Sequence, residues 1–191
     1  MIGRSKILTS ASFEPITTAL AKSHLRVDHS DDDTLIGTLI TAARKAAESF
    51  TGISICQKTF ADYHEDFPSY ITLYYGNVSS VSAVQYYDGA NAQQTLSNTY
   101  YNVDSVEGRA IIRLNDGYTW PDVYAGRHDG VIVTYTAGYS TSAAVPEDLT
   151  LGMKLIIAKY YEQREDVGGA RSFVPTRAES LMHPYRVYDE R

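Results

Sequence analysis

The sequence predicts an α+β fold, in which a small helical bundle carries an antiparallel β-sheet or sandwich as an insert. Apolar residues recur at three- and four-residue spacing before residue 52 and again after residue 146, as they do along one face of a helix. Between these two segments apolar and polar residues alternate, which is the pattern of strands. The predicted organisation is a helical bundle of residues 1–52 and 146–170, a β insert of residues 53–145 and a C-terminal arm of residues 171–191.

Two helices are predicted before the insert. Pro15 lies near the start of a short first helix, where the missing N–H of proline costs nothing. A longer helix is predicted from about residue 31 to residue 51, and Gly52 supplies its stop. Arg44 and Glu48 have the spacing of an ion pair on its polar side. The apolar stripe of this helix consists of Leu35, Ile36, Leu39, Ile40, Ala43, Ala47 and Phe50.

The acidic stretch "DHSDDD" at residues 28–33 is either a metal site or the start of the long helix. Its spacing fits neither an EF-hand loop nor an H-E-x-x-H helix. Ser30 or Asp31 is suited to cap the helix, because its side-chain oxygen can accept a bond from a free backbone N–H. The aspartates that follow lie in the first turn, where the helix dipole favours negative charge. We therefore interpret this stretch as a helix start and predict no bound metal.

About six strands and no helix are predicted between residues 53 and 140. Consecutive strands that are joined by short turns favour an antiparallel sheet or a small sandwich. The clearest strands are those at 70–76, 78–89, 108–117 and 130–139, with weaker ones near 55–65 and 93–103.

A late helix is predicted to begin at Pro146 and to pack on the helices that precede the insert, because none of them buries its apolar stripe alone. Gly37 and Gly152, each inside a predicted helix, would permit a close crossing at this contact. The last stretch holds one short helix, from about residue 176 to residue 182, which Pro184 ends. It has few core residues, and we therefore predict a separate arm.

Composition argues against several functions. The formal net charge is −6 and the cations are scattered singly, which disfavours tight binding of nucleic acid. The one cysteine, Cys56, has no catalytic motif around it, and no G-x-S-x-G elbow or phosphate loop is present. No apolar run reaches the ~18 residues of a membrane span, and no secretory signal is predicted. We predict no enzyme and no cofactor, and we expect synthesis in the cytoplasm of the cell that makes the protein.

Tyrosine is over-represented, with 16 residues, several of them in pairs. Tyrosine suits a half-buried sheet, but it is also favoured at protein interfaces and sugar-binding surfaces. One possible function is therefore a tyrosine-rich β module of a tail accessory protein that binds carbohydrate or a host-surface ligand. The helical frame argues against this function, because a lectin-like sandwich needs no long amphipathic helices on both sides of it.

Several segments, taken in order, resemble the head–tail connector proteins of tailed bacteriophages, also called adaptor or head-completion proteins. Gene transfer agents carry relatives of this family. The resemblance covers nearly the whole chain and is weakest in the middle strands, 55 to 110. The segments that carry it are "ITTALAKSHLRVDHSDDDTLIGTLITAARKAAESFTG", "YTWP" with "VIVTYTAGYS", "VPEDLTLGMKLIIAKYYEQRED" and "RAESLMHPYRV".

The resemblance implies a structural virion protein at the head–tail interface. Such proteins form a ring, commonly dodecameric, beneath the portal protein. The ring extends the DNA channel and docks the next component, a stopper or tail protein. Double-stranded DNA would pass through its lumen without specific binding, and an acidic wall suits that role because it repels phosphates.

The terminal motif is the candidate contact with the portal. Its residues are Arg177, Leu181, Met182, Tyr185, Arg186 and Val187. The alternative for the apolar members is packing against the protein's own bundle, since a short terminal helix commonly docks on its own domain.

Overall fold

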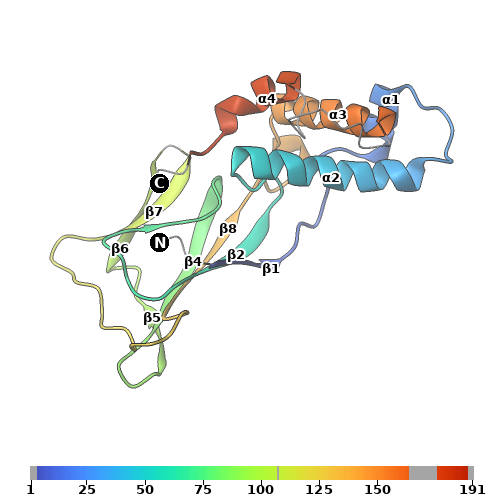
Figure 1. Cartoon of the computed structure of the whole chain (residues 1–191). Helices are drawn as coiled ribbons and strands as arrows, with labels where there is room; N and C mark the ends of the chain where they lie inside the picture. Colours follow the sequence, from blue (N-terminus) through green and yellow to red (C-terminus); the bar gives the residue numbers. More distant parts are fainter. Residues whose placement is uncertain (1–3, 107, 164–175, 189–191) are drawn as a thin grey trace. The chain divides into compact units, whose positions relative to one another are not determined.

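The computed structural model describes residues 4–106, 108–163 and 176–188. It has the predicted α+β fold with antiparallel sheets and divides into two compact units (Figure 1). The strand unit contains residues 4–10, 57–106 and 108–138. The helical unit contains residues 11–56 and 139–188, apart from those not described.

The strand unit consists of two sheets in which every strand pairing is antiparallel. A five-stranded sheet has the order β1-β2-β8-β4-β5, and a three-stranded sheet has the order β3-β7-β6. The predicted strand at 93–103 is two strands, because residues 97–100 form a turn between β5 and β6. The strands are β1 (Arg4–Thr9), β2 (Lys58–His64), β3 (Ile71–Thr72), β4 (Val78–Tyr87), β5 (Gln93–Leu96), β6 (Tyr101–Val106), β7 (Arg109–Leu114) and β8 (Val131–Ala137).

The core of the strand unit lies on one face of β8 and its neighbours. Alternate residues of β8 are fully buried, as expected for a strand with one face in the core. The ring of Phe60 stacks on those of Tyr75 and Tyr135, with centroids 4.4 and 5.4 Å away. Phe67 stacks on Trp120, the only tryptophan of the sequence, at 4.6 Å. Fluorescence of Trp120 is therefore a probe of this unit.

A buried histidine makes the strand unit sensitive to acid. His64 is 8% exposed, and burial lowers its pKa. Below about pH 6.5 the unfolded chain binds a proton at this residue, whereas the folded unit binds it only at lower pH. The stability that depends on neutral His64 is thus present above about pH 6.5 and is lost as the pH falls through the folded-state pKa.

We expect His64→Leu to reduce the loss of stability between about pH 7.5 and pH 5. The measurement is urea unfolding followed by Trp120 fluorescence at both pH values. His128→Leu is the matched control, because the side chain of His128 is 88% exposed. An equal acid loss in His64→Leu and in the wild type would assign the sensitivity to other groups.

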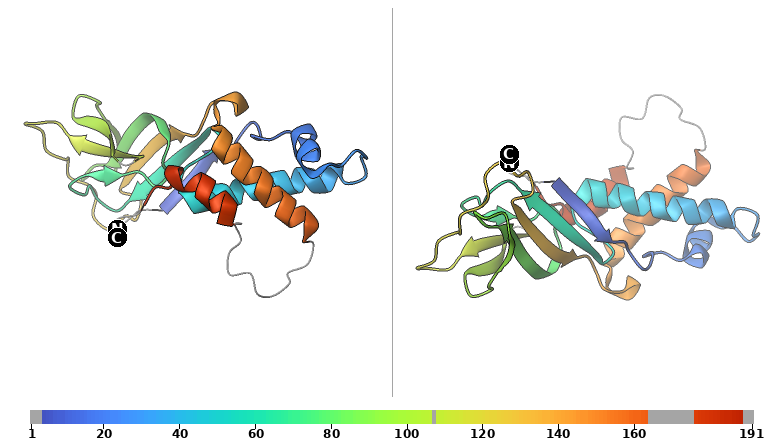
Figure 2. Two further views of the ribbon diagram at one scale, coloured as in Figure 1. Left: turned by 90° about the horizontal axis from the view of Figure 1, so that it is seen from above. Right: turned by 90° about the horizontal axis from the view of Figure 1, so that it is seen from below.

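The helical unit buries one core among four helices, α1 (Thr18–Leu25), α2 (Asp33–Thr51), α3 (Glu147–Glu162) and α4 (Thr176–Met182). Two short 3-10 helices, η1 (Ser142–Ala144) and η2 (His183–Tyr185), flank α3 and α4. Figure 2 shows α3 crossing α2 and α4 lying beside α3. The core contains Ile36, Ile40, Ala43 and Ala47 of the stripe predicted for α2, whereas Leu35 is half-buried and outside it. Helix α3 contributes Leu149, Met153 and Ile156, which are almost completely buried.

The prediction that Ser30 or Asp31 caps the long helix is wrong. Helix α2 begins at Asp33, and its N-cap residue, Asp32, makes no side-chain capping bond. The acidic side chains bind other parts of the unit instead. Asp33 accepts a bond from Lys22 Nζ at 2.7 Å, and Asp32 accepts one from the Tyr161 hydroxyl at 2.5 Å. These two bonds join the start of α2 to α1 and to α3. The aspartates therefore stabilise the packing of the helices and do not cap α2.

Only one of the two helix glycines lies at a close contact. A β-carbon on Gly152 would come within 3.0 Å of Met182 Cγ, so the glycine permits α4 to approach α3. A β-carbon on Gly37 would meet nothing within 4 Å. The close crossing predicted for α2 is therefore found between α3 and α4.

The boundaries of the units differ from the predicted ones at both ends of the chain. Strand β1, which the sequence pattern does not indicate, belongs to the strand unit because it pairs with β2. At the other end, residues 176–188 belong to the helical unit. The "VGG" break predicted at residues 167–169 lies outside the described residues.

Candidate functional site

The terminal motif has a buried face and an exposed face. Ala178 and Met182 are fully buried and Val187 is 8% exposed, and all three belong to the core of the helical unit. The prediction of few core residues in this segment is therefore wrong. Among the candidate contact residues, Arg177 and Arg186 are exposed and Leu181 and Tyr185 are half-buried. A partner can reach the exposed cations and, in part, Leu181 and Tyr185.

Specific backbone contacts hold this segment on the helical unit. The N–H of Val187 donates to the carbonyl of Thr51 at 2.7 Å, at the last residue of α2. Gly52, which follows, has a left-handed conformation with φ of 74°. A β-carbon there would lie 3.3 Å from the carbonyl oxygen of Val187. Glycine thus ends α2 and also leaves room for the returning chain.

The exposed face forms an open cleft of about 520 Å³. The guanidinium of Arg186 lies 5.2 Å from the ring centre of Phe50 and 5.2 Å from that of Tyr188. The Tyr188 hydroxyl is 2.9 Å from Nε2 of His183. An arginine placed between aromatic rings can bind a carboxylate or a further aromatic side chain. The cleft is lined by Phe50, Glu179, Ser180, His183, Pro184 and Arg186.

Five cleft residues are not among the predicted contacts, namely Phe50, Glu179, Ser180, His183 and Pro184. The sequence predicts Phe50 in the core stripe because its spacing in α2 fits the stripe. It is half-buried, since the end of α2 is also where the terminal segment returns. The sequence "HPY" after α4 could have indicated His183 as a surface residue, because it forms a turn that places His183 at the end of a short helix.

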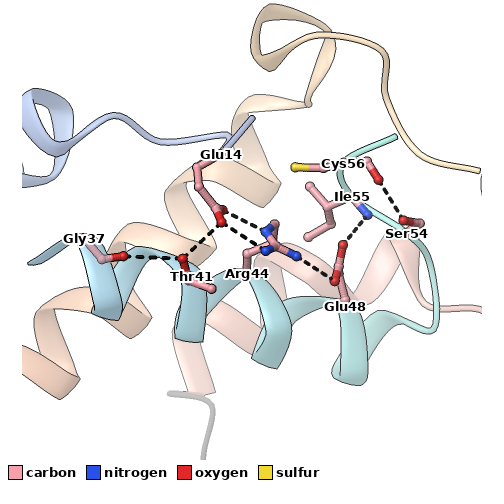
Figure 3. Close-up of polar contacts among 8 residues, drawn as sticks. All are labelled: Glu14, Gly37, Thr41, Arg44, Glu48, Ser54, Ile55 and Cys56. Carbon is pink, nitrogen blue, oxygen red and sulfur yellow. Dashed lines mark hydrogen bonds and ion pairs between the residues drawn. The ribbon is translucent and has the colours of Figure 1, made fainter. Parts of the chain in front are cut away.

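A buried ionic network supports the end of α2 that borders the cleft. Arg44 donates to Glu14 through Nε at 2.7 Å and through a terminal nitrogen at 3.0 Å (Figure 3). Its other terminal nitrogen donates to Glu48 at 3.1 Å. The second Glu48 oxygen accepts the backbone N–H of Ile55 at 3.0 Å. The network thus ties α2 to the segment before α1 and to the segment after Gly52.

The placement of Arg44 and Glu48 corrects the sequence prediction. They form the expected i,i+4 pair, but they are only 7% and 8% exposed and do not lie on a solvent face. The Glu14 bond is the largest cause of a raised pKa at Arg44, which stays charged. The function of this network is structural, since it satisfies charges that the fold has buried.

The described residues contain neither a cluster of metal ligands nor a membrane span. No group of three or more His, Cys, Asp or Glu side chains gathers there in a way that could hold a metal ion. Within the same residues, no helix is long and apolar enough to cross a membrane.

The fold and this surface define a class of protein, a two-unit α+β protein whose exposed features are suited to protein contacts. A model of the phage gp6-like head-tail connector proteins matches residues 16–114, more than half of the chain. The chain belongs to this family. It is a structural protein of the virion head–tail interface, and the resemblance inferred from its sequence is confirmed.

Solved structures show the same fold. A chain in the neck of an empty GTA particle, computed with C6 symmetry, is 23% identical with a TM-score of 0.80, over 97% of this chain and 96% of that one. A chain in the virion of a native gene transfer agent particle is 22% identical with a TM-score of 0.78, over 97% and 96%. One in the neck of a native GTA particle, computed with C12 symmetry, is 22% identical with a TM-score of 0.70, over 96% and 97%. No curated protein matches the sequence.

Proposed function

We propose that the protein forms a homo-oligomeric ring, a dodecamer, beneath the portal protein. The ring extends the DNA channel and docks the next tail component. The observation that carries this proposal is family membership, with a fold shared over 97% of the chain by a protein of a GTA neck. The C6 and C12 symmetries of the similar necks support a ring of six or twelve copies.

Charge supports the channel role. The formal net charge of −6 makes the chain a poor ligand for phosphates, so DNA can slide past such a ring without binding to it. A structural protein of this kind needs no catalytic site. The carbohydrate-binding alternative is less favoured, because the structure contains the helical unit that a lectin-like module would not need.

We further propose that the exposed face of α4 and η2 contacts the portal. The contact residues are Arg177, Tyr185 and Arg186, with Leu181 at the edge of the contact. Met182 and Val187 are buried in the core of the helical unit and support the contact by holding α4 and η2 in place. The cationic and aromatic cleft suits an acidic or aromatic segment of the partner.

Reversing both exposed cations tests this contact. We expect Arg177→Glu with Arg186→Glu to weaken binding to the portal by about tenfold or more, since each reversed charge opposes its partner. The measurements are binding to purified portal and negative-stain micrographs of the mixture. Arg26→Glu with Lys45→Glu is the matched control, because both cations are exposed on the same unit and the charge change is equal. Normal decoration of portals by the first variant would place the contact elsewhere.

A further inference from the structure

Strand β1 has an unpaired edge and exposed apolar side chains. The sheet order places it at the edge of the five-stranded sheet, and no described strand pairs with its outer side. Ile7 is 47% exposed and Leu8 is 50% exposed. An edge strand presents a row of free N–H and C=O groups, and proteins commonly cover or charge such an edge. Two large apolar residues on it indicate that another strand covers it.

The exposure of Ile7 interrupts a buried row of side chains. Ile7 pairs with Phe60 of β2, and paired residues point to the same face of the sheet. Phe60 is fully buried in the core of the strand unit. Ile7 therefore lies on the face of the sheet that carries the core. The core includes Phe60 of β2 but does not extend to Ile7 on the next strand. A further strand would continue this row.

Strand β6 has the matching feature. It lies at the edge of the three-stranded sheet. Val103 is 39% exposed and pairs with Ile112 of β7, which is fully buried in the same core. Val103 is thus also on the core face, at the last strand of its sheet.

We propose that β1 of one copy pairs in antiparallel fashion with β6 of the next copy in the ring. Pairing Ile7 with Val103 creates a continuous row of apolar side chains across the two copies. The row runs from Phe60 and Ile7 of one copy to Val103 and Ile112 of the other. The same register places Lys6 opposite Asp104, so the adjacent pair combines opposite charges. A bulge at Leu8 ends the regular part of β1, and the proposed contact therefore covers residues 4–7 and 103–106.

The other free edges fit this contact less well. Strand β3 has two residues and β5 has four, whereas β1 and β6 have six each. The side chains of Gln93, Gln94 and Thr95 on β5 are polar and exposed, and Leu96 is already buried. Figures 1 and 2 show β1 and β6 on opposite sides of the strand unit. Two different edges on opposite sides make a head-to-tail contact, which is the type that can close into a ring.

Cysteine pairs test the register. The inference rests on the proposed ring, so full-length protein is oxidised mildly in the presence of purified portal as a template. A mixture of Lys6→Cys and Asp104→Cys proteins should give disulfide-linked dimers, and the double variant should give longer oligomers. Cys56 is fully buried and stays in place. The matched control combines Lys6→Cys with Ser105→Cys, in which the second cysteine points to the other face and should link poorly.

Charge exchange tests the same pair without disulfides. We expect Lys6→Glu and Asp104→Lys each to weaken the contact between neighbouring copies by about fivefold, and the double exchange to restore it. Cross-links in Lys6→Cys alone would show that two β1 strands meet, and would overturn the proposed pairing. Assembly on the portal without the Lys6–Asp104 cross-link would also overturn it, while the ring itself would stand. Absence of any assembly by the wild-type protein would instead overturn the proposed function.

Discussion

Replacing Arg44 by methionine is expected to lower the free energy of unfolding of the helical unit by about 3–5 kcal/mol. Arg44 bridges Glu14 and Glu48, and the side chain of Glu48 is 10% exposed. Without the guanidinium, the buried Glu48 loses the cation that Arg44 supplies, and removing one partner of a buried pair costs more than the ion pair itself contributes. The measurement is urea unfolding followed by far-UV circular dichroism, which reports mainly the helices.

Two further variants make this prediction specific. Lys45→Met changes the neighbouring, exposed cation and should alter the free energy of unfolding by less than about 0.5 kcal/mol. Adding Glu14→Gln and Glu48→Gln to Arg44→Met should recover part of the loss, because the two carboxylates that lose the guanidinium are then neutral amides. A loss of stability that persists in the triple variant would indicate that Arg44 acts through packing and not through charge.

Met182→Ala is expected to destabilise the helical unit by about 2–5 kcal/mol. Met182 is fully buried, and its side chain covers Gly152 where α3 and α4 are in contact. Removing it leaves a cavity between these two helices. The loss of stability is measured by urea unfolding followed by far-UV circular dichroism. Truncation before residue 176 removes Ala178, Met182 and Val187 together. We therefore expect the truncated helical unit to unfold, contrary to the arm predicted from the sequence.

The matched control is Arg177→Ala, one turn earlier on the exposed side of α4. Its effect on stability should stay within about 0.5 kcal/mol. A second comparison uses Gly152→Ala, whose new methyl group clashes with Met182 in the wild type. The clash should be smaller in Met182→Ala, so the two changes should not be additive. Additive effects would show that the new methyl group does not meet Met182. A stable truncated protein would show that α4 is an arm after all.

The sequence was sufficient for the class of fold and for the family. The period of three to four residues in α2 and α3 and the alternation in β8 follow from burial of one face, and local spacing records that burial directly. Gly52 was correctly read as the end of the long helix, because few other residues adopt its left-handed conformation. The short helix at 176–182 was also predicted with its observed bounds.

The local sequence pattern does not predict the role of a residue type that can serve more than one structural role. The aspartates before α2 could have capped it, but Tyr161 and Lys22, distant in the sequence, bind them instead. Gly37 and Gly152 look alike in sequence, and only the position of α4 makes one of them necessary. Strand β1 was missed because a single edge strand with both faces partly exposed has no alternation to detect.

The sequence by itself determined which segments are helices and strands and which family the chain belongs to. Only the tertiary structure decided which side of the terminal motif is free. Met182 and Arg186 are four residues apart, yet one is fully buried and the other is exposed beside Phe50. The physical reason is that burial depends on what packs against a side chain. For this segment the packing surface comes from α2 and α3, more than a hundred and about twenty residues away along the chain.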